Sequence, residues 1–277
     1  MSIHLRPNRV PFRFSGPDAE KLLNDVITGI VRAEPGRARW WALLSPQGKI
    51  QAEGLVGWHE DAFWLDVDLG VADAFFKRMR MYRLRAQVDI ADMREGFRVG
   101  WSAQPPDTPD GIIPHGDDRA GGLGWRVIAP ESQAAGWIAD DQPFRQARVK
   151  AAIAELGPDF APDTTFAHDI GMDILQGIDF GKGCYVGQEV VSRMKHRGTA
   201  RRRPVLVSGV PQAGNLPIMV GDREAGVLGT VVDGEGLGIV RLDRIVDPST
   251  VTVAGEPVSL GLPFWATYAF GESPGAD

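Results

Sequence analysis

The most chemically informative segment of the sequence surrounds its single cysteine. Cys184 lies in the run Lys182-Gly183-Cys184-Tyr185-Val186-Gly187-Gln188-Glu189, and a further glycine precedes this run. Three glycines within seven residues mark backbone that turns sharply or lies close to another group. We therefore expect the thiol to be reachable. A helix that begins near Gly187 would place Cys184 by a helix N-terminus, and Lys182 adds a positive charge; both favour the thiolate.

A buried, inert side chain is the usual state of a lone cysteine. The residues alone leave that alternative and a reactive Cys184 both open. One cysteine forms no internal disulfide, and no cysteine or histidine cluster has the spacing of metal ligands, so we expect no metal site. The low cysteine content predicts a cytoplasmic location.

The cysteine segment resembles the signature of the YgfZ family, folate-binding proteins related to the T-protein (aminomethyltransferase) of the glycine cleavage system. The resemblance continues through Val191-Ser192-Arg193-Met194 into Arg202-Arg203. It also covers Ser15–Ala19, Leu44–Lys49 and Tyr82–Arg85. The chain departs from the family at His168-Asp169, where other branches show a Pro-Gln-Glu-like run.

This resemblance implies an α+β fold with two ferredoxin-like domains and a C-terminal small antiparallel β-barrel, arranged as a T-protein-like ring around a central pocket. It implies an accessory factor for the assembly or repair of iron–sulfur clusters in client enzymes, including enzymes that methylthiolate tRNA. The cofactor would be tetrahydrofolate or a derivative, and the partners would be folate and iron–sulfur client enzymes or cluster carriers. Cys184 would be the functional thiol, assisted by Lys182.

Two alternatives belong to other classes of function. The first is a tetrahydrofolate-dependent aminomethyl- or methyltransferase of the T-protein type. Its usual Arg-Leu-Glu triplet is here Arg148-Val149-Lys150, which replaces the acidic pterin anchor by a lysine. The second is a module that binds tRNA directly. A net charge of −6 argues against that alternative.

A folate ligand needs an apolar wall for its pterin and cations for its glutamate tail. A helix expected over residues 142–156 offers both, because Phe144 and Arg148 are four residues apart and share one face. The resemblance matches Phe144 to an aromatic folate contact. The alternative is that Phe144 belongs to the core and Arg148 is a solvated surface cation. The candidate cofactor-binding residues are Phe144, Arg148, Gly183, Tyr185, Gly187, Gln188 and Glu189.

The pattern of apolar residues divides the chain into three parts. Residues 1–92 predict strands and helices in the order β-α-β-β-β-α-β, close to a ferredoxin-like unit. Residues 93–199 predict a second α+β unit that carries the cysteine segment. Residues 200–277 predict a small antiparallel barrel, because short valine-rich runs alternate with Gly, Pro and Asp.

Four local expectations accompany this division of the chain. Residues 104–119, rich in proline and charge, predict an exposed loop. The run 84–90 predicts a strand, and residues 187–194 predict a short helix. One of the adjacent tryptophans Trp40 and Trp41 is expected to face away from the core.

Composition restricts the classes of protein further. The 277 residues are 43% hydrophobic and 24% charged, which excludes a largely disordered chain and a coiled coil. We expect no transmembrane segment, no secretory signal and a monomer. The stretch 193–203 concentrates six cations. It is either a positive rim for folate, RNA or an acidic partner, or an exposed linker into the barrel.

Overall fold

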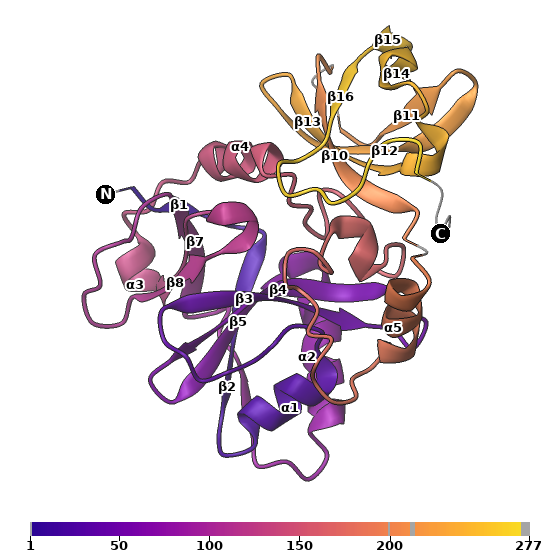
Figure 1. Cartoon of the computed structure of the whole chain (residues 1–277). Coiled ribbons are helices and arrows are strands. Elements are labelled where there is room, and N and C mark those ends of the chain that lie inside the picture. The colour runs from indigo at the N-terminus through magenta and orange to yellow at the C-terminus, as the bar shows by residue number, and fades with distance from the viewer. Residues whose placement is uncertain (1, 199, 211–213, 273–277) are drawn as a thin grey trace.

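A nine-stranded sheet dominates the N-terminal half of the protein (Figure 1). The computed structural model describes residues 2–198, 200–210 and 214–272. The strands lie in the order β1-β7-β9-β8-β3-β4-β5-β2-β6, and every neighbouring pair is antiparallel except β3 with β8. The strands are β1 (His4–Leu5), β2 (Arg9–Ser15), β3 (Arg37–Leu44), β4 (Ile50–His59), β5 (Ala62–Asp68), β6 (Asp89–Asp92), β7 (Phe97–Ser102), β8 (Ile113–Asp117) and β9 (Trp125–Pro130).

The parallel pair β3–β8 connects the two parts that we expected to be separate N-terminal domains. Arg37 of β3 stands opposite Gly116 of β8. The expected boundary at 92/93 lies between β6 and β7, which occupy the same sheet. The N-terminal α+β elements are thus organised around one continuous sheet.

Both faces of the central strands are covered. Helices α1 (Ala19–Val26) and α2 (Ala72–Arg83) pack with Trp41 in one apolar cluster, and α1 buries its leucines there. Trp40, on the opposite face of β3, belongs to a second cluster that extends to the barrel. The prediction that one of these tryptophans faces outward is wrong, because a sheet covered on both sides buries successive side chains alike.

The remaining helices are α3 (Glu131–Ala134), α4 (Gln142–Lys150) and α5 (Gln188–His196), with short 3-10 turns such as η2 (Arg119–Gly121) and η3 (Ala167–Ile170). Of these helices, α4 contacts the C-terminal part, whereas α3 packs beside β7 and β9 and α5 beside η3 (Figure 1). The expected helix over 142–156 is wrong in its second half, because α4 ends at Lys150 and Ala152 has a φ of +52°. Leaving the helix lets the chain bury Ile153, whose carbonyl accepts a hydrogen bond from Arg148.

Two further local predictions need correction. Residues 104–119 contain β8 rather than only an exposed loop. His115, Asp117 and Arg119 are buried there. Asp117 and Arg119 form an ion pair, so these two charged residues do not require exposure to water, as their charge had suggested. In the run 84–90, only Asp89 and Ile90 belong to a strand, because Leu84 ends α2 with a φ of +45°.

The C-terminal part forms a seven-stranded antiparallel sheet, above the large sheet in Figure 1. Its order is β15-β14-β11-β12-β13-β10-β16, which matches the short strands expected from residue 200 onward. No helix in the described residues is long and apolar enough to cross a membrane. The strands are β10 (Arg202–Ser208), β11 (Leu216–Val220), β12 (Arg223–Val232), β13 (Glu235–Arg241), β14 (Val251–Val253), β15 (Glu256–Pro257) and β16 (Ser259–Gly261).

Candidate functional site

The cysteine loop, residues 181–187, holds Cys184 at the surface. Its side chain is free and exposed, which excludes the alternative of a buried thiol. The segment before the loop is attached to the connection between α1 and β3. The Thr28 hydroxyl donates to the carbonyl of Gly177 at 2.7 Å, and the backbone N–H of Asp179 donates to the Thr28 carbonyl at 2.9 Å.

Lys182 anchors the same loop from within. Its ammonium donates to the carbonyl of Gly29 at 2.7 Å and to that of Ile27. Burial lowers the pKa of Lys182 to about 8, although Asp179 and Asp25 oppose this shift. The hydrogen bonds of Lys182 in the described chain go to backbone rather than to the thiol. It therefore supports the position of the loop.

The residues after the cysteine fix its other side. Tyr185 is buried, with its ring 5.1 Å from the Lys182 ammonium. Gly187 precedes α5 with a φ of +82°, and a Cβ there would lie only 2.8 Å from the carbonyl oxygen of Ser45. Glycine is thus required both by conformation and by space. Gln188 begins α5, and Glu189 forms an exposed ion pair with Arg193 at 2.5 Å.

The basic stretch 193–203 is partly engaged within the chain. The Lys195 ammonium lies 3.6 Å from the centre of the Phe180 ring. Arg203 pairs with Asp173 at 2.7 Å and donates to the carbonyl of His168. The contacts of Arg203 attach the start of the barrel to η3, as expected of a linker. The cations outside these contacts leave the interpretation as a positive rim open as well.

His168 itself is buried beside the cysteine loop. Its ring centre is 6.2 Å from that of Phe180. Burial lowers its pKa, with Asp173 acting in the opposite direction. The departure from the family pattern at this position therefore places a neutral aromatic side chain of η3 beside Phe180, the residue before the cysteine loop.

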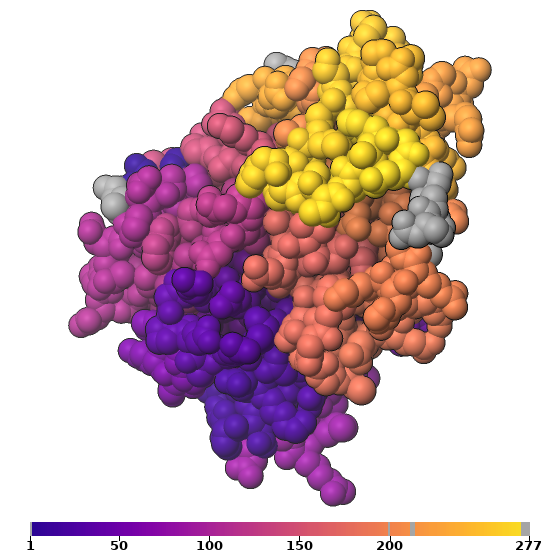
Figure 2. All heavy atoms as spheres, in the orientation of Figure 1, coloured from indigo at the N-terminus to yellow at the C-terminus, as the bar shows by residue number. Residues whose placement is uncertain are grey.

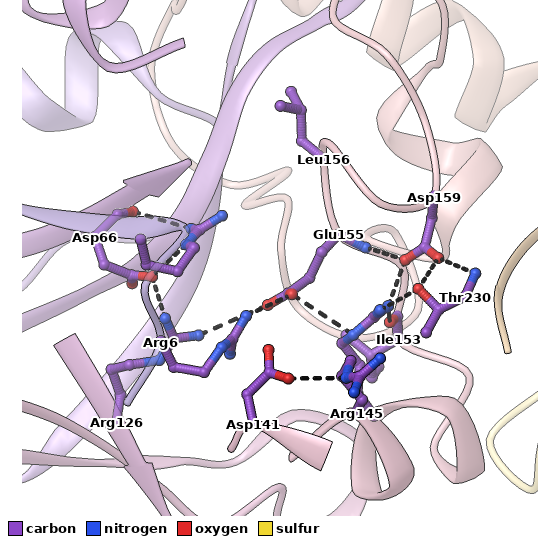
Figure 3. A network of polar contacts seen from close by, with 12 residues as sticks. Arg6, Asp66, Arg126, Asp141, Arg145, Ile153, Glu155, Leu156, Asp159 and Thr230 are labelled. Atoms are coloured by element: carbon purple, nitrogen blue, oxygen red, sulfur yellow. Dashed lines mark hydrogen bonds and ion pairs between the residues drawn. The ribbon is translucent and has the colours of Figure 1, made fainter. Parts of the chain in front are cut away.

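Arg148 lies in a buried network of arginines and carboxylates. Figure 3 shows this network around Glu155 and Asp159. Arg148 forms an ion pair with Asp159, and its Nε lies 3.5 Å from Glu155. It also donates to the Thr230 hydroxyl at 2.5 Å and to the carbonyl of Ile153. Burial alone would lower the pKa of Arg148, but the two carboxylates raise it above its ordinary value.

Glu155 lies at the centre of this network. It accepts a hydrogen bond from Arg6 at 2.8 Å, and Figure 3 shows it between Arg6 and the Asp159 side. Burial opposes its ionisation, yet Arg6, Arg148 and other cations lower its pKa below the ordinary range. A buried carboxylate among cations stays charged across physiological pH. On the other side of Arg6, Arg126 and Arg9 both pair with Asp66.

Phe144 belongs to the core, as the alternative interpretation proposed. It is fully buried, and the Arg6 guanidinium carbon lies 3.6 Å from its ring centre. Arg148 fits neither interpretation, because it is neither a surface cation nor open to a ligand. Its guanidinium is already occupied by two carboxylates. Arg148 thus connects α4 to the barrel through Asp159 and Thr230.

A pocket of about 300 Å³ lies where the sheet, η2 and the C-terminal segment meet. Figure 2 shows these parts converging near the middle of the drawn face. Trp40 and Trp265 provide aromatic wall, and Arg119, held by Asp117, lies 5.1 Å from the Trp40 ring. Phe144 and Arg148 do not line it. The other lining residues include Arg37, Arg39, Asp118, Leu175, Gln176 and Phe264.

Sequence reasoning missed these pocket residues and most of the network. The network signal was present in β2 and β5, where Arg9 and Asp66 occupy strand positions beside apolar neighbours. Charges of opposite sign within buried strands indicate a buried ion pair. The pocket left no comparable signal, because its walls come from segments far apart in the sequence.

Comparison with known proteins supports this description of the fold. Residues 200–268 match the family described as "CAF17, C-terminal beta-barrel domain". The crystal structure of glycine cleavage system aminomethyltransferase T from Bartonella henselae superposes with a TM-score of 0.75, covering 97% of this chain and 87% of that one at 14% identity. The predicted T-protein-like α+β fold with a C-terminal barrel is confirmed.

Curated relatives carry the name "Iron-sulfur cluster assembly factor IBA57 homolog, mitochondrial". The protein from Pyricularia oryzae is 28% identical over 88% of this chain and 72% of its own length. That from Chaetomium globosum is 30% identical over 75% of this chain and 57% of its own. The chain therefore spans between about half and three quarters of these relatives. Their name is IBA57 rather than YgfZ.

The predicted cytoplasmic location is wrong by this comparison, because the relatives are named as mitochondrial proteins. The prediction relied on cysteine content. One cysteine shows that the chain has no internal disulfide, but that property does not distinguish one reducing compartment from another.

Proposed function

We propose that the protein is an accessory factor for the assembly or repair of iron–sulfur clusters, with Cys184 as the thiol that contacts the cluster. The observation that carries this proposal is the exposed Cys184 on an anchored loop. A loop fixed by Lys182 and Gly187 presents the sulfur in a defined place without burying it. The names of the relatives support the same class of function.

A single thiolate supplies one iron ligand, whereas a cluster normally takes four from protein. A partner, either a cluster carrier or a client enzyme, must therefore provide the other ligands. Cys184 would lose its proton on binding iron, and the bound cluster would be shared across the interface until it is transferred. Enzymes that methylthiolate tRNA are proposed among the clients on the basis of the sequence resemblance.

Replacement of Cys184 by serine tests this proposal. Serine has nearly the same shape but is a much poorer ligand for iron. In a strain that lacks the protein, Cys184→Ser is expected to be folded and present, yet to leave iron–sulfur enzyme activities at the level of the deletion. Ser132→Ala, at an exposed position on α3, is the matched control and should restore them fully. Full restoration by Cys184→Ser would overturn the proposal.

We further propose that the pocket beside Trp40 binds tetrahydrofolate or a derivative. The aromatic walls suit a flat pterin, and Arg37 and Arg39 offer cations at the pocket for the glutamate tail. Their present ion pairs, with Asp118 at 3.4 Å and Glu34 at 3.3 Å, are exposed and therefore weak. A ligand carboxylate can replace them at little cost.

Calorimetric titration with tetrahydrofolate tests the pocket. Losing a charge-assisted hydrogen bond costs about 1.5–3 kcal/mol, so Arg39→Ala should weaken binding roughly ten- to a hundredfold. Arg32→Ala is the matched control, because Arg32 also pairs with Glu34 but does not line the pocket. Equal affinities of these variants would overturn the pocket beside Trp40 as the folate site, and no binding to the wild type at millimolar ligand would remove folate from the proposal.

The aminomethyltransferase alternative is supported by the fold match and by the sequence resemblance to relatives of the T-protein. A fold does not determine an activity. It would require transfer of a one-carbon group to tetrahydrofolate by the purified protein, which an assay with a labelled aminomethyl donor would detect. The tRNA-binding alternative would require that the protein bind tRNA with an affinity that falls as salt rises. The acidic net charge opposes such binding.

A further inference from the structure

The exposed side of α2 and the turn after it combine apolar side chains with positive charge. Met81 and Leu84 are 63% and 86% exposed, respectively. The exposed cations Lys77, Arg80, Arg83 and Arg85 belong to the same helix and the turn after it. We propose that this α2 face, consisting of these six residues, docks an acidic segment of a partner protein that also carries apolar side chains.

The cations of the α2 face are not neutralised within the described chain. None of the four forms an ion pair with a described residue, and Arg83 donates only to the carbonyl of Val88 at 3.4 Å. The one acid of the adjoining groove, Asp73, already pairs with Arg94 at 2.7 Å. A concentrated positive surface on a protein of net charge −6 is complementary to acidic groups of a partner.

The α2 face borders a hollow that can hold side chains. A shallow, open groove of about 520 Å³ runs along α2, lined by side chains of that helix alone, among them Phe76, Met81 and several of the cations. The Arg80 guanidinium lies 5.6 Å from the centre of the Phe76 ring, so the groove has an aromatic side with a charged edge. Such an arrangement suits apolar side chains flanked by carboxylates, as in helix-in-groove recognition.

Leu84 has an unfavourable backbone conformation that contacts within the protein do not offset. Its φ of +45° lies in a region of backbone conformation that residues other than glycine rarely adopt. The side chain makes little contact with the rest of the protein, because it is almost fully exposed. Strain of this kind is found where a residue serves a contact outside the local fold. A partner that covers Leu84 would supply the missing burial.

A protein segment fits this surface better than a membrane or RNA. The apolar face of α2, with Phe75 and Met79, is already buried in the core, which leaves Met81, Leu84 and the half-buried Phe76 for a lipid surface. RNA binding would call for exposed aromatic rings to stack with bases, whereas the one aromatic ring of this groove, Phe76, is half-buried and the exposed apolar residues are Met81 and Leu84.

The test uses the full chain and a short fluorescent helical peptide in which glutamates flank two leucines. Binding is measured by anisotropy at low and physiological salt. Lys77→Glu/Arg80→Glu should weaken binding at least about tenfold, and Met81→Ser/Leu84→Ser should weaken it about three- to tenfold. Arg32→Glu/Arg223→Glu, which reverses two exposed cations elsewhere, is the matched control and should change affinity less than about twofold.

Three results would overturn the proposal. The first is no binding of the peptide to the wild-type protein at low salt. The second is an equal loss in the α2 variants and in the control variant, which would indicate attraction to positive charge in general. The third is that a short single-stranded RNA or anionic vesicles bind with the same dependence on Met81 and Leu84. The proposal uses no residue of the cysteine loop, so a failure of the proposed function leaves it untouched.

Discussion

The cysteine loop and the buried arginine network use polar residues in opposite ways. Cys184 is exposed, and the neighbouring Lys182 holds the loop through hydrogen bonds to backbone carbonyls. Replacing the Cys184 thiol therefore breaks none of the contacts that position the loop. Arg148 is buried, and its guanidinium is occupied by Asp159, Glu155 and Thr230. The difference teaches that a charged side chain suited to a ligand can instead connect parts of the fold.

The largest difference between the two regions should appear on removal of Arg148. Arg148→Ala would leave Asp159 and Glu155 buried with fewer counter-charges, and breaking a buried ion pair in this way costs about 3–5 kcal/mol. We expect the free energy of unfolding in urea to fall by that amount, and tetrahydrofolate binding to change only through stability.

Arg145→Ala is the control on the same helix. Arg145 pairs with Asp141 at 2.8 Å, and its side chain is 43% exposed, so its loss should cost less than about 1 kcal/mol. A fully stable Arg148→Ala that specifically loses folate binding would contradict the structural role and restore the role expected from sequence.

An intermediate effect is expected at Lys182, and it depends on pH. Burial lowers its pKa to about 8 from 10.5, so between these values the unfolded chain binds more protons than the folded one. Stability supplied by this site therefore rises with pH through that window. The stability of the wild type minus that of Lys182→Met should increase from pH 7.5 to pH 10.

Urea unfolding of both proteins across this range measures the difference. A difference that stays flat or falls with pH would show that the lysine is solvated and that the loop is not anchored by it. Tyr185, whose pKa burial raises, is present in both proteins and cancels in the comparison.

The smallest effect on stability is expected at Cys184 itself. Because the thiol is exposed, Cys184→Ser should change the free energy of unfolding by less than about 0.5 kcal/mol. The wild-type thiol should also react fully with an alkylating agent in the absence of denaturant. A thiol that reacts only after unfolding, or a serine variant that is strongly destabilised, would remove the contrast between the two regions.

The sequence was sufficient for most elements, because their signals are local. The apolar periodicity of α1, the alternation in β2 and the valine-rich strands of the barrel all lie within short windows. The glycines around Cys184 likewise predicted a turning, accessible loop. Features that depend on what covers a segment were missed, such as the burial of both Trp40 and Trp41.

The misplaced parts of the candidate site have the same cause. Phe144 and Arg148 do share one face of α4, as their spacing predicts, but that face points into the core. Nothing in the local sequence shows that Asp159 and Thr230 lie opposite Arg148. The early end of α4 also depends on distant partners, because the chain turns there to bury Ile153.

The pocket beside Trp40 has a consequence for how the molecule is held together. One wall comes from β3 and another from Phe264 and Trp265, and the Trp265 indole N–H donates to the carbonyl of Ala151 at 2.7 Å. A ligand there would contact both β3, near the N-terminus, and the segment with Phe264 and Trp265, near the C-terminus, and would stabilise their association. At a hundredfold excess over its Kd, it would add about 2.7 kcal/mol to their association. The resistance of the C-terminal segment to proteolysis would then increase with the concentration of available ligand.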